Sequence, residues 1–130
     1  MRFRTLVAVP FIVLSLVGCG SSGSGSGGGG GATLPADTLL IKAVEGIAWD
    51  AKSYVATSAG GKVKIAVEND STLPHNLHLL DSDNVDVGLA LSVANRGDVK
   101  SDDYPLAPGT YKVICTIAGH GNMKATLTVK

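Results

Sequence analysis

The sequence has little cysteine, few aromatic residues and no excess of charge of either sign. Its 130 residues include two cysteines, two methionines and one tryptophan, and 11 basic residues balance 11 acidic ones. Because nucleic-acid binding needs a basic patch or stripe, and none is present, we expect no nucleic-acid partner. A chain of this length has room for one domain with one hydrophobic core.

The sequence also lacks a hydrophobic run long enough to span a membrane permanently, which takes about 20 apolar residues. The longest run, residues 6–17, has 12 residues and is interrupted by one proline and one serine. It follows Arg2 and Arg4, and a short apolar run behind positive charges is typical of a secretory signal peptide. We therefore predict that residues 1–18 are an export signal. The mature protein would be extracytoplasmic, with a net charge of about −2.

The apolar run ends in Leu16, Val17, Gly18 and Cys19, a sequence that resembles the lipobox of bacterial lipoproteins. The resemblance implies cleavage before Cys19 and a diacylglyceryl thioether on its sulfur. That lipid would anchor the protein to a bacterial membrane, at the periplasmic or the cell surface. The alternative is an ordinary signal peptide cut nearby, which leaves Cys19 as a free or paired thiol.

A stretch of only glycine and serine follows, at residues 20–31. It has no side chain to bury and maximal backbone freedom, so we predict a flexible tether. Its twelve residues would have a root-mean-square span of roughly 20 Å. The mature chain is accordingly divided into a tether at 19–33, with Cys19 lipidated, and a folded domain at 34–130.

Short strand patterns separated by turn residues make up the rest of the chain, with no long amphipathic helix and no internal repeat. The segment 85–93 is ambiguous and reads as a helical turn or an irregular loop. Regular short strands with turn signals predict an all-β fold, a β-sandwich with Greek-key connections. The expected strands are residues 39–44, 53–57, 62–68, 76–80, 99–104, 110–115 and 124–130.

The last expected turn carries a cysteine, a histidine and a methionine at close spacing. Four residues separate Cys115 from His120, and two separate His120 from Met123, so all three lie on one loop between adjacent strands. Thiolate, imidazole and thioether are soft ligands that favour copper, and two histidines, a cysteine and a distant methionine form the blue-copper site. Each residue alone is more commonly a core or turn residue, but the combination indicates a mononuclear copper site.

The second histidine is found upstream, where His75 and His78 lie three residues apart. In an extended segment they face opposite ways, so only one can join the site. His75 is better placed, because it follows Pro74 and shares its face with Leu77 and Leu79. His78 is expected to face solvent.

These motifs together resemble the cupredoxin family over roughly residues 39–130. The resemblance lies in Pro74-His75-Asn76, in Cys115-Thr116, and in Gly119-His120 followed by Met123. It implies that His75, Cys115 and His120 are the close ligands of one type 1 copper and that Met123 is the axial ligand.

The resemblance also implies supporting roles for residues beside the ligands. Asn76 is expected to hydrogen-bond toward Thr116, which would tie the two ligand loops together. The backbone N–H groups of Asn76 and Ile117 are expected to donate to the sulfur of Cys115 and so tune the metal.

We therefore predict an electron carrier and not an enzyme. We expect a monomer that meets redox proteins transiently, of the cytochrome or copper-oxidoreductase type, through a docking surface with few charges around His120. The alternatives are a copper-delivery or storage protein and a metal-free adhesion module on the same scaffold. The scarcity of methionine argues against delivery, and the intact ligand set argues against adhesion.

Overall fold

A computed structural model describes residues 33–130, and all of the following refers to that part of the chain. The predicted export signal, the lipidated Cys19 and nearly all of the glycine–serine tether lie outside it. Within it, no helix is long and apolar enough to cross a membrane.

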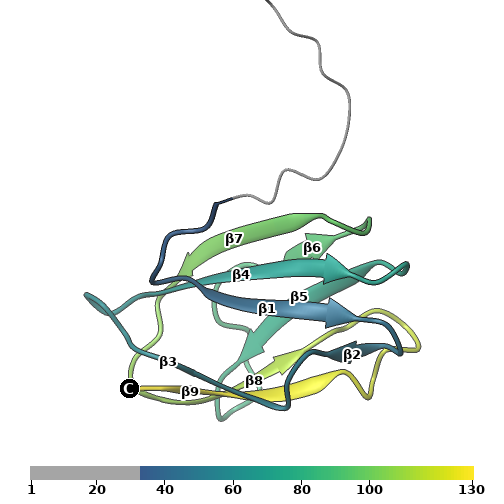
Figure 1. Cartoon of the computed structure of the whole chain (residues 1–130). Helices are drawn as coiled ribbons and strands as arrows, with labels where there is room; N and C mark the ends of the chain where they lie inside the picture. Colours follow the sequence, from purple (N-terminus) through teal and green to yellow (C-terminus); the bar gives the residue numbers. More distant parts are fainter. Residues whose placement is uncertain (1–32) are drawn as a thin grey trace, which may run out of the picture.

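The described residues form nine strands in two sheets that pack face to face (Figure 1). The first sheet has the order β2-β1-β4-β7 and the second has the order β3-β9-β8-β5-β6. The prediction of an all-β sandwich is therefore confirmed. The strands are β1 (Leu39–Val44), β2 (Ala48–Trp49), β3 (Ser53–Ala56), β4 (Val63–Asp70), β5 (His75–Leu80), β6 (Leu91–Val93), β7 (Val99–Tyr104), β8 (Gly109–Ile114) and β9 (Lys124–Val129).

Both sheets are mixed. β1 runs parallel to β4, and β3 runs parallel to β9, while the other pairs are antiparallel. The chain therefore crosses between the sheets repeatedly instead of forming a simple series of hairpins. As a result, the β4–β5 loop and the β8–β9 loop emerge at the same end of the sandwich, at the right of Figure 1.

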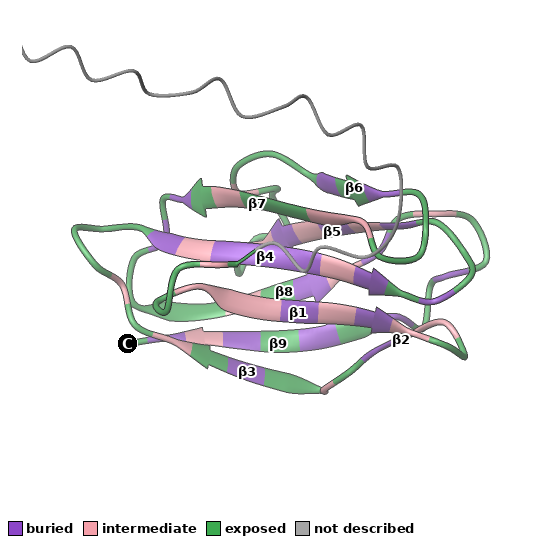
Figure 2. Cartoon of the chain, turned by 45° about the horizontal axis from the view of Figure 1, so that its top comes forward, coloured by how far each residue is buried: buried purple, intermediate pink, exposed green. Residues whose placement is uncertain are grey.

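Alternating side chains fill the space between the sheets. In β5 the residues His75, Leu77 and Leu79 are buried, and the residues between them are half-buried (Figure 2). β9 alternates in the same way. This is the period of two expected for strands with one face on the core. The alternation points the first side chain of β5 inward, at the end where the two loops meet.

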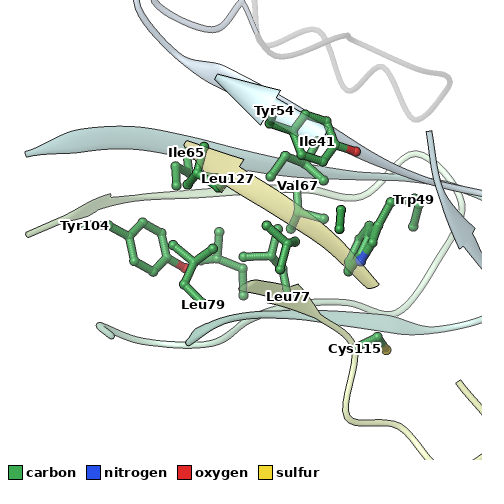
Figure 3. Packing of buried hydrophobic residues seen from close by; sticks show 14 of the residues in the cluster. Ile41, Trp49, Tyr54, Ile65, Val67, Leu77, Leu79, Tyr104, Cys115 and Leu127 are labelled. Atoms are coloured by element: carbon green, nitrogen blue, oxygen red, sulfur yellow. The ribbon is translucent and has the colours of Figure 1, made fainter. Parts of the chain in front are cut away.

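The core is one continuous cluster, with Tyr104 near one end and Cys115 and Trp49 near the other (Figure 3). Its middle is aliphatic, with Ile65 and Leu127 fully buried between the sheets. The cysteine thus closes the end of a hydrophobic core, where water is excluded.

Two short strands differ from expectation. The ambiguous segment 85–93 contains no helix and ends in β6, which pairs with β5. β2 was not predicted, and it pairs with β1 after a tight turn in which Gly46 and Ile47 both have positive φ, at 87° and 56°. A β-branched residue such as Ile47 rarely adopts a positive φ, so the local sequence does not predict this turn.

Candidate metal centre

Three buried side chains converge at the loop end of the sandwich. One potential ligand atom from each of His75, Cys115 and His120 lies within 4.8 Å of the other two. The residues are only 1%, 5% and 6% exposed, respectively. A buried cluster of two imidazoles and a thiol brings together the donor types that bind soft transition metals.

Two loops deliver these side chains. His75 opens β5 directly after the β4–β5 loop, and Cys115 follows the last residue of β8. His120 is held by a turn in which its N–H donates to the carbonyl of Ile117 at 3.0 Å, and its own carbonyl accepts from the N–H of Met123 at 2.8 Å. Gly119 has φ of +88°, which permits the tight bend. The backbone thus holds the histidine over the end of the core.

The donor atoms lie in a geometry that suits a metal ion. Nδ1 of His120 lies 3.5 Å from Sγ of Cys115, and the two imidazole rings are 4.9 Å apart between centroids, tilted by 43°. Nδ1 of His75 is buried and has no hydrogen-bond partner within the described residues. Because buried polar atoms normally have a hydrogen-bond partner, an unpaired nitrogen here is consistent with a metal ligand.

The buried environment also disfavours the charged form of His75. Burial lowers the pKa of His75, and the neighbouring imidazole of His120 lowers it further, while the carboxylate of Glu45 acts weakly in the opposite direction. A neutral imidazole is the form that binds a metal.

Met123 is fully buried just before β9. Its backbone is held from two sides, because its carbonyl accepts from the indole Nε1 of Trp49 at 3.1 Å and from the N–H of Cys115 at 3.3 Å. The hydrogen bond from Trp49, which lies in β2, therefore connects the β8–β9 loop to the first sheet. The axial role of Met123 stays a prediction.

Asn76 and Thr116 connect the two loops with a pair of hydrogen bonds. Nδ2 of Asn76 donates to Oγ1 of Thr116, and the N–H of Thr116 donates to Oδ1 of Asn76, both at 2.8 Å. Each residue directly follows a member of the cluster. The bonds expected from the backbone N–H groups of Asn76 and Ile117 to the sulfur stay predictions, since the side-chain hydrogen bonds of the described residues give that sulfur only His120 as a partner.

His78 lies on the opposite face of β5 from His75, as the strand period predicts, and it is outside the cluster. It is partly exposed, and its side chain also makes contacts on that outer face. Its side chain is 21% exposed, Nδ1 lies 2.8 Å from Oδ1 of Asp86, and Nε2 lies 3.2 Å from Oγ1 of Thr116. His78 therefore supports the loop connection from outside.

Sequence reasoning missed two buried polar residues, Asn69 and Ser71, which are 0% and 1% exposed. Oγ of Ser71 lies 2.7 Å from Nε2 of His75. The segment Asn69–Asp70–Ser71–Thr72 has the composition of an ordinary solvated turn. The sequence offered one signal for Ser71, namely its position four residues before the candidate ligand His75.

A two-sheet sandwich with a buried His–Cys–His cluster at its loop end is the arrangement of the cupredoxins, and the chain has the cupredoxin fold. No protein-family model matches the sequence, and no curated protein sequence does. Solved structures do match it.

Auracyanin from Roseiflexus castenholzii is 21% identical, with a TM-score of 0.60, over 73% of this chain and 98% of that one. Auracyanin B is 27% identical, with a TM-score of 0.55, over 75% of this chain and 91% of that one. An azurin from Methylomonas sp. strain J is 13% identical, with a TM-score of 0.61, over 74% and 99% of the two chains. The predicted resemblance to cupredoxins is thereby confirmed.

Replacing Asn76 by alanine is expected to lower the free energy of unfolding by about 1–3 kcal/mol, because two hydrogen bonds between the loops are lost at about 1 kcal/mol each. Thr116→Ser is the matched control, since it keeps the backbone N–H and the hydroxyl that make both bonds. Denaturant unfolding of the metal-free proteins measures the difference. Equal stability of the two variants would contradict a structural role for this pair.

Proposed function

We propose that the protein binds one copper ion through His75, Cys115 and His120, with Met123 as the axial ligand, and that it carries single electrons between other redox proteins. The observation that carries this proposal is the buried cluster of two imidazoles and one thiol, whose atoms lie within 4.8 Å. The copper, when bound, supplies a one-electron couple. This donor set is that of blue-copper electron-transfer sites.

The residues of the chain hold the donors and exclude water. Oγ of Ser71 contacts Nε2 of His75, which leaves Nδ1 as the ring nitrogen without a hydrogen-bond partner in the described residues, and the thiol of Cys115 lies at the end of the hydrophobic core. Backbone hydrogen bonds hold the β8–β9 loop on both sides of His120. Such constraint keeps the donors in one arrangement in both oxidation states, and small rearrangement favours rapid electron transfer.

The burial of the cluster supports a carrier over an enzyme. A substrate would need an open position next to the metal, and the three ligand side chains are at most 6% exposed. It also supports a carrier over a copper-delivery protein, because delivery needs ligands that a partner can reach.

Electrons would pass through the edge of His120. The two loops that meet there carry exposed, uncharged residues, namely Leu73, which is 42% exposed, Pro74, Ala118 and Gly121. A small patch with few charges suits brief contact with a redox protein, of the cytochrome or copper-oxidoreductase type. We propose that the protein acts as a monomer outside the cytoplasm, tethered to a bacterial membrane by lipidated Cys19.

Copper titration tests the proposal. One equivalent of Cu(II) is expected to produce an intense thiolate-to-copper visible band and an EPR spectrum with narrow copper hyperfine splitting, and both should disappear and return through cycles of reduction and oxidation. His78→Ala should keep the band, because His78 lies outside the cluster. An ordinary tetragonal Cu(II) spectrum would contradict the proposal. Rapid copper loss to a chelator would favour delivery.

A further inference from the structure

A buried polar group contacts His75 through its ring nitrogen Nε2. It consists of Asn69, the last buried residue of β4, and Ser71 in the β4–β5 loop. Oγ of Ser71 lies 2.7 Å from Nε2 of His75 and 3.0 Å from Oδ1 of Asn69. The three side chains are 1% exposed or less, so no bulk water competes for these bonds.

Backbone partners determine the orientation of the Asn69 amide. Oδ1 accepts from the N–H of Ser71 at 2.9 Å, and Nδ2 donates to the carbonyl of Leu73 at 2.8 Å and, more weakly, to that of Val93 at 3.4 Å. A flipped amide would place its NH₂ group against the N–H of Ser71 and its oxygen against two carbonyls. The atom that faces the Ser71 hydroxyl is therefore the amide oxygen, which only accepts.

The hydroxyl of Ser71 has one proton and two lone pairs to share among four neighbours. Oδ1 of Asn69 at 3.0 Å and the carbonyl of Leu73 at 3.2 Å can only accept, and the N–H of Leu73 at 3.2 Å can only donate. If the hydroxyl proton went to His75, both oxygens would face lone pairs of Ser71. The proton therefore goes toward these oxygens, and Oγ accepts from His75.

We propose that Ser71, oriented by Asn69, is a positioning residue that holds His75 in the tautomer protonated at Nε2, so that the lone pair of Nδ1 is free to bind the metal before any metal arrives. The assignment rests on the proposed copper site for its purpose, but its geometry stands on the hydrogen bonds alone. It also accounts for the buried, unpartnered Nδ1 of His75. A partner on the second nitrogen orients a histidine ligand and strengthens its binding.

The first test uses the metal-free wild-type protein. Two-bond ¹H–¹⁵N NMR correlations of the imidazoles at about pH 8, above the usual histidine pKa of about 6.5, report which nitrogen of His75 carries the proton. Burial lowers the pKa of His75, so the ring is neutral there. Protonation at Nε2 is expected. Protonation at Nδ1 would overturn the proposal.

The second test compares Ser71→Ala with Ser92→Ala, the same change on the exposed side of β6. Ser71→Ala is expected to shift metal-free His75 toward the Nδ1-protonated tautomer and to weaken Cu(I) binding by about 10- to 100-fold in competition with a chelator, the usual cost of losing such a partner. Ser92→Ala should change neither quantity. Wild-type tautomer and affinity in folded Ser71→Ala would overturn the proposal.

These tests separate the two proposals. If wild-type protein gave no blue copper spectrum, the proposed function would fail, whereas the tautomer of His75 in the metal-free protein would still decide the role of Ser71. If Ser71→Ala did not fold, the wild-type NMR measurement alone would decide it.

Discussion

Replacing Cys115 by serine is expected to abolish the intense visible absorption of the copper-loaded protein completely. The band arises from charge transfer between a thiolate and Cu(II), and a serine hydroxyl neither ionises near neutral pH nor offers a soft donor. His75 and His120 would remain, so copper would still bind, with the weak absorption and wide hyperfine splitting of a tetragonal site. Visible and EPR spectra of wild type and variant, each with one equivalent of Cu(II), measure the change.

The same variant tests whether Cys115 is only a core residue. It is 5% exposed and belongs to the hydrophobic cluster, and an unligated cysteine packs as a small hydrophobe. In that case serine would lower the free energy of unfolding by about 1–3 kcal/mol, the cost of burying a hydroxyl, and would leave the copper spectrum unchanged. A spectrum indifferent to the substitution would remove Cys115 from the site.

The site ligands were accessible to sequence reasoning because their chemistry is rare and their spacing is short. Cys115 and His120 lie on one loop, so their proximity follows from chain connectivity. His75 comes from a strand distant in sequence, and its donor type, the strand period, the preceding Pro74 and the resemblance to cupredoxins pointed to it. The structure brings the three together.

Strand period also explains which elements were predictable. β1 and β9 each have several residues of alternating burial, and their bounds agree with expectation within one residue. β2 and β6 have two and three residues, too few for a period to appear. β2 pairs with the longer strand β1, and β6 pairs with the longer strand β5. The sequence of a short strand does not show which strand it pairs with.

The supporting residues behind the ligands were hidden for a different reason. Asn69 and Ser71 are polar and lie at the end of β4 and just after it, where polar residues are normally exposed. Here the β4–β5 loop folds over the end of the core, and Arg96 holds it from outside by donating to the carbonyl of Asp70 and to Glu45, both at 3.0 Å. Glu45 in turn accepts from the N–H of Thr72 at 3.1 Å. Burial of the loop is thus a tertiary effect that turn composition does not reveal.

Replacing Leu77 by alanine is expected to lower the free energy of unfolding of the metal-free protein by about 2–5 kcal/mol, the usual cost of a large-to-small change in a packed core. Leu77 is 0% exposed, pairs with Leu91 on β6 and lies two residues after His75 on the same face of β5. Since domains of this kind are stable by about 5–15 kcal/mol in total, the loss is a large fraction. Urea or guanidinium unfolding measures it.

Leu89→Ala is the matched control, because Leu89 is 72% exposed and its truncation should change stability by about 0.5 kcal/mol or less. Copper should restore part of the stability of Leu77→Ala, since a ligand present at 1,000 times its dissociation constant stabilises the folded state by about 4 kcal/mol. That recovery needs His75 to remain in place above the cavity. A Leu77→Ala protein that is destabilised by less than about 1 kcal/mol would contradict a core packed around β5. If copper did not raise the stability of the Leu77→Ala protein, the position of His75 would depend on the packing of Leu77.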